Sequence, residues 1–290
     1  MTSGTSVDVL RYTAFPDTAF PDRPAGGNPA GVVLDATGLD DAAMLAIAAE
    51  VGYSETVFLF PGAAAGSFTA RYFSPLAEVP FCGHATVAAA VALARRSGPG
   101  ELLFATRAGE VPVTVTEENG VPRATLSSVE PYQEPVTADD LAEALAALDW
   151  PSAGLDPALP PAIAFAGARH LVVAAATRER LAELDYDVER LAALMRRLDL
   201  TTVQLVWREA PAVFHVRDPF PVGGVVEDPA TGAAAAALGG YLRAGGHVPD
   251  AATLTLHQGH DLGRPSLLTV TLVPGDPRVH VSGTAAPIPA

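Results

Sequence analysis

Hydrophobic residues follow two spacings along this chain. Segment 39–52, LDDAAMLAIAAEVG, has a helical spacing, whereas segment 54–60, SETVFLF, ends in the continuous apolar run of a strand buried on both faces. Segments 111–116 and 268–273, VPVTVT and LTVTLV, predict further strands. The pattern therefore predicts a chain of short helices and strands with a substantial core.

Two alanine-rich segments, 85–94 and 233–240, are small and apolar on every side. A surface helix would show one apolar stripe, so we expect each of these helices to be enclosed all round. Basic residues followed by Gly98 and by Gly245 mark their expected ends. Because small side chains let strands approach closely, we predict a sheet curled around a central helix in each half.

An internal repeat relates the two halves. Residues 68–93 and 214–239 align without a gap, at an offset of 146 residues from Phe68 to Phe214, and the alignment pairs Arg71 with Arg217. The same offset extends upstream into the preceding strand and helix. Each half therefore has the order helix, strand, strand with arginine, proline-containing loop, alanine-rich helix and further strands.

The repeat predicts an α+β protein with two similar domains, each a curled, mostly antiparallel β-sheet or barrel around a central apolar helix. We place the N-terminal half at residues 1–128 and the C-terminal half at residues 129–290. The final strand, about residues 279–290, can return to pair with the strands of the first half.

Composition and charge limit the partners. The 290 residues carry a net charge of −15, so nucleic acid and anionic membrane surfaces are excluded as partners. The single cysteine excludes an intramolecular disulfide and a cysteine-rich zinc site. The N-terminal sequence MTSGTSVDVLRYTAF does not resemble a secretion signal, and no apolar run is long enough to span a membrane. We therefore expect a cytoplasmic protein with a small-molecule partner.

A residue with acid/base chemistry precedes each alanine-rich helix. At the repeat offset, Cys82 corresponds to Asp228. A helix N-terminus has unpaired N–H groups and a partial positive charge, which stabilise a carboxylate or a developing enolate. Two such ends would form an anion site without a metal. Asp228 is also followed by Pro229, which fits a simple helix cap, and both interpretations stay open.

Three residues near the first of these helices each have a functional and a structural interpretation. His84 is either a neutral hydrogen-bond donor in the first turn or a packing histidine. Cys82 is either a small buried hydrophobe or a thiol whose pKa the helix lowers. Glu55 lies either at the exposed end of its strand or in an apolar cleft that raises its pKa for proton transfer. Its repeat partner is Thr201, so the halves differ chemically.

Signatures of several enzyme classes do not occur in the sequence. It has no G-x-S-x-G, Walker or G-x-G-x-x-G motif, so serine hydrolase, nucleotide-hydrolysing and dinucleotide-binding functions lack their motif. The segment HQGH offers His257 and His260 as metal ligands, but no third ligand is near it in the sequence, and a turn is favoured. We expect no metal and no cofactor.

Five segments occur in an order that is specific to one family. They are GNPAGVVLD from Gly27, SETVF from Ser54, FSPLAEVPFCGHAT from Phe73, EDPATGAAA from Glu227 and GRPSLL from Gly263. In this combination the chain resembles the phenazine biosynthesis PhzF-like family, which has the diaminopimelate epimerase-like fold. The resemblance implies two barrel-like halves, usually in a homodimer, with a cofactor-free active site between the halves.

The resemblance also implies residue roles. In the phenazine enzyme that names the family, a glutamate moves a proton within trans-2,3-dihydro-3-hydroxyanthranilate. By motif, the catalytic residues here are Glu55, His84 and Asp228, and the substrate-binding residues are Cys82, Gly83, Thr231, Gly232 and Ala233. Where the phenazine isomerase has serine, this chain has Ala233, which removes a substrate hydrogen bond and argues against the phenazine substrate itself.

The leading hypothesis is a cofactor-independent isomerase that transfers a proton on a small carboxylate-bearing metabolite. One alternative is an epimerase, a racemase or a carbon-carbon bond hydrolase that uses Cys82 with Asp228. A symmetric pair of thiols is unavailable for a two-cysteine racemase, because Asp228 stands at the predicted second position. Another alternative is a noncatalytic small-molecule binding protein that retains the cleft.

Overall fold

A computed structural model describes residues 7–19 and 26–289, which fold as two compact units. Unit 1 contains residues 7–16, 28–127 and 282–289, and unit 2 contains residues 17–19, 26–27 and 128–281. The chain therefore leaves unit 1 after residue 16 and re-enters it at residue 28. No pattern in the sequence had indicated this early excursion.

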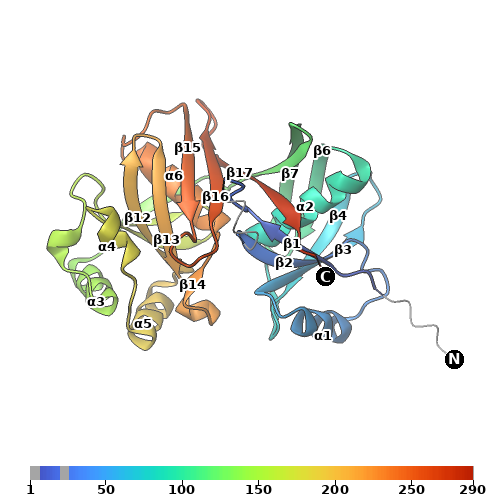
Figure 1. Ribbon diagram of the computed structural model, residues 1–290, viewed down its shortest axis with the longest axis horizontal. Helices are drawn as coiled ribbons and strands as arrows, with labels where there is room; N and C mark the ends of the chain where they lie inside the picture. The colour runs from blue at the N-terminus through green and yellow to red at the C-terminus, as the bar shows by residue number, and fades with distance from the viewer. Residues whose placement is uncertain (1–6, 20–25, 290) are drawn as a thin grey trace. The chain divides into compact units, whose positions relative to one another are not determined.

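Unit 1 is a closed ring of strands (Figure 1). In order around the ring they are β1 (Leu10–Ala14), β2 (Asn28–Val33), β3 (Glu55–Pro61), β4 (Ser67–Phe73), β6 (Gly100–Thr106), β7 (Gly109–Glu118), β8 (Val121–Ser127) and β17 (Val279–Pro287). The part of β17 that belongs to unit 1 closes the ring by pairing with β8 and β1. The pairs β2–β3 and β4–β6 are parallel. The antiparallel pairs are β1–β2, β1–β17, β3–β4, β6–β7 and β7–β8.

Helix α2 (Gly83–Ser97) runs through the middle of this ring. All its residues from His84 to Ala92 are buried, and it packs against β1, β2, β3, β7 and β8. Small side chains allow contact with strands on several sides at the density of a protein interior. The prediction of an enclosed helix is confirmed, and Gly98 ends it as expected.

Helix α1 (Asp41–Val51) covers the outside of unit 1. Asp40 caps its start, and Gly52 ends it in the left-handed conformation that glycine adopts readily. Its buried face forms a core cluster with side chains of β3 and β4. These bounds agree with the helix expected within residues 39–52.

Unit 2 repeats the arrangement with a second curled sheet. In order across it, the strands are β9 (Tyr132–Pro135), β10 (Ala162–Phe165), β11 (Arg169–Ala174), β12 (Thr202–Ala210), β13 (Val213–Pro219), β15 (Ala252–Gln258) and β16 (Ser266–Leu272). Helix α6 (Gly232–Ala244) packs against β9, β10, β11 and β16. A Cβ on Gly239 would lie 2.7 Å from Val270 Cγ1, so the close approach of helix and sheet requires glycine there. The predicted enclosure is confirmed for this helix too.

The remaining helices of unit 2 lie on the other face of its sheet, where a separate apolar cluster forms. They are α3 (Ala138–Leu148), α4 (Arg178–Ala182), α5 (Val188–Leu198) and the short 3-10 turns η1 (Ser152–Gly154) and η2 (Pro221–Gly223). Among helices of the described residues, none combines the length and apolar character needed to cross a membrane.

The order of elements confirms the internal repeat, but its offset changes along the chain. Arg71 on β4 and Arg217 on β13 match at the expected offset. Four residues, 74–77, then join β4 to β5 (Glu78–Val79), whereas seven residues, 220–226, join β13 to β14 (Glu227–Asp228). The longer connection in unit 2 shifts the following helix by three residues.

This shift corrects the predicted counterpart of Cys82. Cys82 is the N-cap residue of α2, and Thr231 is the N-cap residue of α6. Thr231 therefore corresponds to Cys82, whereas Asp228 lies on the preceding strand. His84 corresponds in the same way to Ala233. A gap-free alignment missed this because the additional residues fall in the loop immediately before the helix.

Candidate active site

Glu55, Cys82 and His84 meet in unit 1 at the N-terminus of α2. Glu55 begins β3, and His84 lies in the first turn of the helix. The Glu55 Oε2 atom lies 3.5 Å from Cys82 Sγ and 3.5 Å from His84 Nε2. Cys82 Sγ lies 3.3 Å from His84 Nδ1. Cys82 and His84 are buried, but the Glu55 side chain keeps 18% of its exposure, so the carboxylate remains accessible to a small molecule.

Two polar residues orient the His84 ring. Asn28 Nδ2 donates a hydrogen bond of 3.2 Å to His84 Nδ1, and Ser54 Oγ lies 3.4 Å from His84 Nε2. Because Nδ1 accepts from the amide, the proton of the neutral ring is on Nε2, the nitrogen nearer Glu55. Asn28 and Ser54 were not singled out from the sequence, although both belong to the family segments that begin at Gly27 and Ser54.

The N-terminus of α2 is not capped by a side chain. Its first N–H groups therefore keep the donor capacity and partial positive charge of a helix start. A Cβ on Gly83 would meet only Phe81 Cε1, at 3.9 Å. Internal packing does not require glycine at this position, so the missing side chain leaves room beside the backbone amide.

The second group of predicted residues lies in unit 2, before and within the first turn of α6. Asp228 Oδ2 accepts a hydrogen bond of 2.6 Å from Thr231 Oγ1. Gln258 Nε2 donates to the Asp228 carbonyl at 2.8 Å and to Thr231 Oγ1 at 2.9 Å. Gly232 and Ala233 begin the helix. The interpretation of Asp228 as a helix cap is wrong, because the helix starts four residues later and has no side-chain cap.

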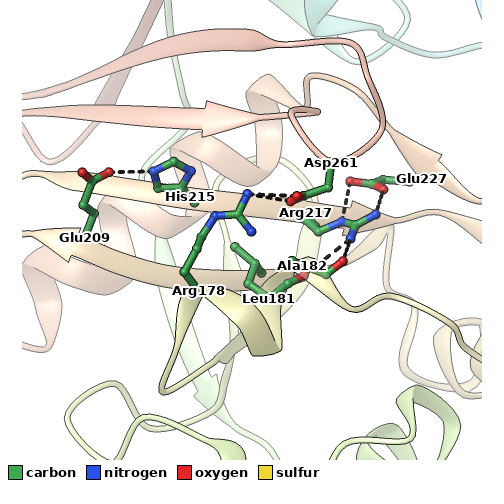
Figure 2. A network of polar contacts seen from close by, with 8 residues as sticks. All are labelled: Arg178, Leu181, Ala182, Glu209, His215, Arg217, Glu227 and Asp261. Atoms are coloured by element: carbon green, nitrogen blue, oxygen red, sulfur yellow. Dashed lines mark hydrogen bonds and ion pairs between the residues drawn. The ribbon is translucent and has the colours of Figure 1, made fainter.

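A buried ion pair anchors the strand that carries Asp228. Arg217 Nη2 and Nε contact the two carboxylate oxygens of Glu227 at 2.6 and 3.1 Å, and Arg217 Nη1 donates to the Ala182 carbonyl at 2.6 Å (Figure 2). The side chains of Arg217 and Glu227 are 9% and 1% exposed. Bidentate pairing fixes both distance and orientation, so it holds the residue next to Asp228 in place.

Asp218 is a buried carboxyl group paired in register with Asp228. Burial raises its pKa well above the usual value, and the nearby Asp228 and Glu227 charges raise it further. Its Oδ1 atom accepts a hydrogen bond of 2.8 Å from Thr202, which begins β12 as Glu55 begins β3. Thr202, and not the expected Thr201, therefore stands at the Glu55 position of unit 2, and the acid or base of unit 1 has no carboxylate counterpart there.

We expect Asp218→Asn to raise the thermal unfolding temperature by a few degrees near pH 8 and to change it little near pH 4. The raised pKa of Asp218 means that its stabilising effect is complete below the usual aspartate pKa of 3.8 and is lost as the pH rises through the raised pKa of the folded state. Asparagine stays neutral and avoids that loss. Differential scanning fluorimetry at both pH values measures the effect, and an equal shift at both would contradict it.

The three groups of unit 1 also form a set of metal donors. One carboxylate oxygen, one thiol sulfur and one imidazole nitrogen lie within 4.8 Å of one another, and these are donor types that Zn²⁺ accepts. Each of these atoms already has a protein neighbour within 3.5 Å. The same distances also suit proton transfer between the three groups.

The structure gathers the predicted site residues into two sets. Unit 1 holds Glu55, Cys82, Gly83 and His84, and unit 2 holds Asp228, Thr231, Gly232 and Ala233. Within unit 1 the residues come from β3 and from the start of α2, and Glu55 and Cys82 are 27 positions apart in the chain. The first set combines an imidazole, a thiol and a carboxylate, whereas the second set has the Asp228 carboxylate and the Thr231 hydroxyl.

Comparisons with known proteins identify the relatives of this chain. A family model described as phenazine biosynthesis-like protein matches residues 18–289. The uncharacterized isomerase YddE of Escherichia coli strain K12 is 33% identical over 272 residues, which cover 90% of this chain and 91% of YddE. A trans-2,3-dihydro-3-hydroxyanthranilate isomerase of Pseudomonas fluorescens is 32% identical over 248 residues, which cover 84% of each protein.

The fold has a close match among solved structures. The crystal structure of a PhzF-family phenazine biosynthesis protein from Bacillus anthracis superposes with a TM-score of 0.84 at 26% identity, over 98% of this chain and 97% of that one. The predicted α+β class, with a curled sheet around a central helix in each unit, is therefore confirmed.

Proposed function

Because this chain is an isomerase that belongs to the phenazine biosynthesis-like family, we propose that Glu55 moves a proton within a small carboxylate-bearing substrate. The observation that carries the proposal is the meeting of the Glu55 carboxylate with His84 at the uncapped start of α2. Proton transfer next to a carbonyl or carboxylate needs a base and a donor for the developing negative charge. Unit 1 supplies both.

The reaction has two proton steps and no net change in atoms. Glu55 takes a proton from one substrate carbon, and the electron pair of that C–H bond shifts toward a conjugated oxygen or carbon. The N–H groups at the start of α2 and His84 Nε2–H stabilise the negative charge. Glu55 then returns the proton to a different carbon, which completes the isomerisation.

Gly83 and Cys82 define the surface against which the substrate lies in this proposal. The room beside the Gly83 amide lets a substrate oxygen approach the backbone N–H. Cys82 lies between Glu55 and His84, within 3.5 Å of each. We assign it to the wall of the site, with its thiol donating to the Glu55 carboxylate.

Asp228 is proposed as a further catalytic residue, and Thr231, Gly232 and Ala233 as substrate-binding residues. The hydrogen bonds that Thr231 and Gln258 make to Asp228 support a fixed orientation for the aspartate. Ala233 has no hydroxyl group, which supports a substrate that differs from that of the Pseudomonas fluorescens relative. We further propose that the protein acts as a cytoplasmic homodimer, as the family resemblance implies. A role in phenazine biosynthesis itself rests on the name of the matched family.

The test of this function is a panel of small carboxylic acids incubated with the protein in deuterated water. A substrate gains deuterium and yields an isomer of otherwise unchanged composition, and both are read by mass spectrometry. Asp228→Asn in the same assay reports whether the second set of residues contributes. Binding of several acids by calorimetry without exchange in any of them would instead favour a noncatalytic binding protein.

The alternative chemistry through Cys82 makes an opposite prediction. We expect Cys82→Ser to retain exchange within about tenfold of the wild type, because the wall position tolerates a slightly smaller polar atom. The measurement is the initial rate of deuterium incorporation into the substrate found in the panel. If Cys82→Ser lost exchange while Glu55→Gln kept it, the epimerase or hydrolase alternative would replace the present proposal.

A further inference from the structure

A second cluster of ionisable groups lies in unit 2 and takes no part in the proposed reaction. It consists of Asp17, His257 and His260. Asp17 Oδ2 lies 3.6 Å from His257 Nδ1 and 3.6 Å from His260 Nε2. The ligand atoms of all three residues lie within 4.8 Å of one another. Three potential donor atoms from two distant segments of the chain therefore converge on one point.

The burial of Asp17 is unusual for a carboxylate. Its side chain is 2% exposed. Its Oδ1 atom accepts a hydrogen bond of 3.0 Å from the Ala19 N–H, but Oδ2 has no hydrogen-bond partner in the described part of the chain, and neither has His257 Nδ1. A buried charge is costly unless it is paired or coordinates a metal. The two atoms that lack a hydrogen bond lie 3.6 Å apart, which exceeds hydrogen-bonding distance.

The spacing of the cluster fits a tetrahedral metal. Imidazole nitrogens and carboxylate oxygens bind Zn²⁺ at about 2.0–2.1 Å, so two such ligands at a tetrahedral angle lie about 3.4 Å apart. The two distances from Asp17 Oδ2 are close to this value. Side chains of His257 and His260 keep 24% and 18% exposure, which leaves an approach for the ion and for a water ligand.

The backbone holds the three residues in place. The Pro265 carbonyl accepts from the N–H groups of Asp17 and of Gly27, at 3.0 Å each. Between the two histidines, Gly259 has a φ of 71°, and a Cβ there would lie 2.3 Å from the Arg264 carbonyl oxygen. The turn after β15 therefore requires glycine, and this turn sets the direction of His260 relative to His257.

Neighbouring charges and rings leave the cluster available to a cation. The charge of Arg178 reaches His260, and both carboxylate oxygens of Asp261 pair with that arginine at 2.9 Å (Figure 2). His215 stacks on His257 with 4.9 Å between ring centroids, while its Nε2 atom contacts Glu209 at 2.6 Å. The guanidinium charge is thus balanced, and the stacked ring restrains His257.

We propose that Asp17, His257 and His260 bind a divalent first-row metal ion of the Zn²⁺ type, with water at the remaining position. A donor set of two imidazoles and one carboxylate binds such ions in preference to Mg²⁺ or Ca²⁺. The ion would neutralise the buried carboxylate and join residue 17 to the turn between β15 and β16. Its role is structural, because none of the residues proposed for proton transfer is a ligand.

The test uses the full chain without an affinity tag, stripped of metal by a chelator and titrated with Co²⁺ alone. We expect one equivalent to bind with the visible d–d bands of a tetrahedral site and to be displaced by Zn²⁺. Asp17→Asn and His260→Gln should each lose these bands. The matched control is His280→Gln, because His280 Nε2 also lies near a carboxylate, 3.3 Å from Asp276 Oδ2, and has the same 18% exposure. This control should bind Co²⁺ as the wild type does.

A second measurement distinguishes the loss of the metal site from misfolding of a variant. A further variant tests whether Co²⁺ binds instead to Glu55, Cys82 and His84. Zn²⁺ should raise the unfolding temperature of the wild type and of His280→Gln but not of His260→Gln. Cys82→Ser should keep the Co²⁺ spectrum. The proposal fails if the wild type binds no Co²⁺, if Asp17→Asn binds it unchanged, or if the spectrum shows a thiolate charge-transfer band that Cys82→Ser removes. None of these outcomes depends on the isomerase activity.

Discussion

Glu55→Gln is expected to reduce the exchange of substrate hydrogen with deuterated water by about 10²–10⁴-fold, the usual contribution of a general acid or base. The amide has nearly the same size as the carboxylate, but it cannot accept a proton at neutral pH. The variant keeps an oxygen near His84 Nε2 and Cys82 Sγ, so the surrounding contacts change little. Mass spectrometry of the substrate over time gives the exchange rate directly.

The matched control for this variant is Glu50→Gln. Glu50 lies on the exposed surface of α1. We therefore expect Glu50→Gln to catalyse the exchange of substrate hydrogen at the wild-type rate. Unfolding temperatures within about 2 °C of the wild type for both variants would exclude a general loss of structure. Full exchange by Glu55→Gln would remove Glu55 from the mechanism and leave Cys82 or Asp228 as the group to examine.

Arg217→Ala is expected to lower the free energy of unfolding by about 3–5 kcal/mol, because it leaves the buried Glu227 carboxylate without its partner. The pair is almost completely shielded from water, with exposures of 9% and 1%. The arginine also donates to the carbonyl of Ala182 at the end of α4, as Figure 2 shows. Chemical denaturation followed by circular dichroism measures the loss.

The internal repeat supplies the control for this variant. Arg71 makes the equivalent bidentate contact with Glu78, at 2.8 and 2.6 Å, but its side chain is 21% exposed. Arg107 also contacts Glu78, at 2.6 Å. Because water and a second arginine compensate the carboxylate, we expect Arg71→Ala to cost only about 1 kcal/mol. Equal losses in the two variants would contradict the argument from burial.

The candidate site was partly readable from residue types and their order. Glu55 at the start of an apolar strand and His84 in the first turn of an apolar helix are local patterns, and the structure places their side chains 3.5 Å apart. Asn28 carried no comparable local signal. Its contact with His84 spans 56 positions in the chain, and such a contact depends on which strands become neighbours around the ring.

The alignment of the halves shows where sequence reasoning failed. Matching Cys82 to Asp228 assumed a constant offset, but the connection before α6 is three residues longer than the one before α2. Both connections are irregular segments without periodicity, so the hydrophobic pattern contains no information about the extra residues. The positions of the helix starts, and with them the equivalence of Cys82 and Thr231, become visible only in the folded chain.

By itself, the sequence determined the two-fold repeat, the two enclosed alanine-rich helices and the acidic and imidazole groups beside the first of them. These features follow from local composition and spacing, since a helix that is apolar all round has to be surrounded. Only the tertiary structure decided that residues 17–19 and 26–27 group with unit 2 and that Asp17 meets His257 and His260. Contacts across some 240 positions depend on the order in which strands close around each helix, and no local pattern encodes that order.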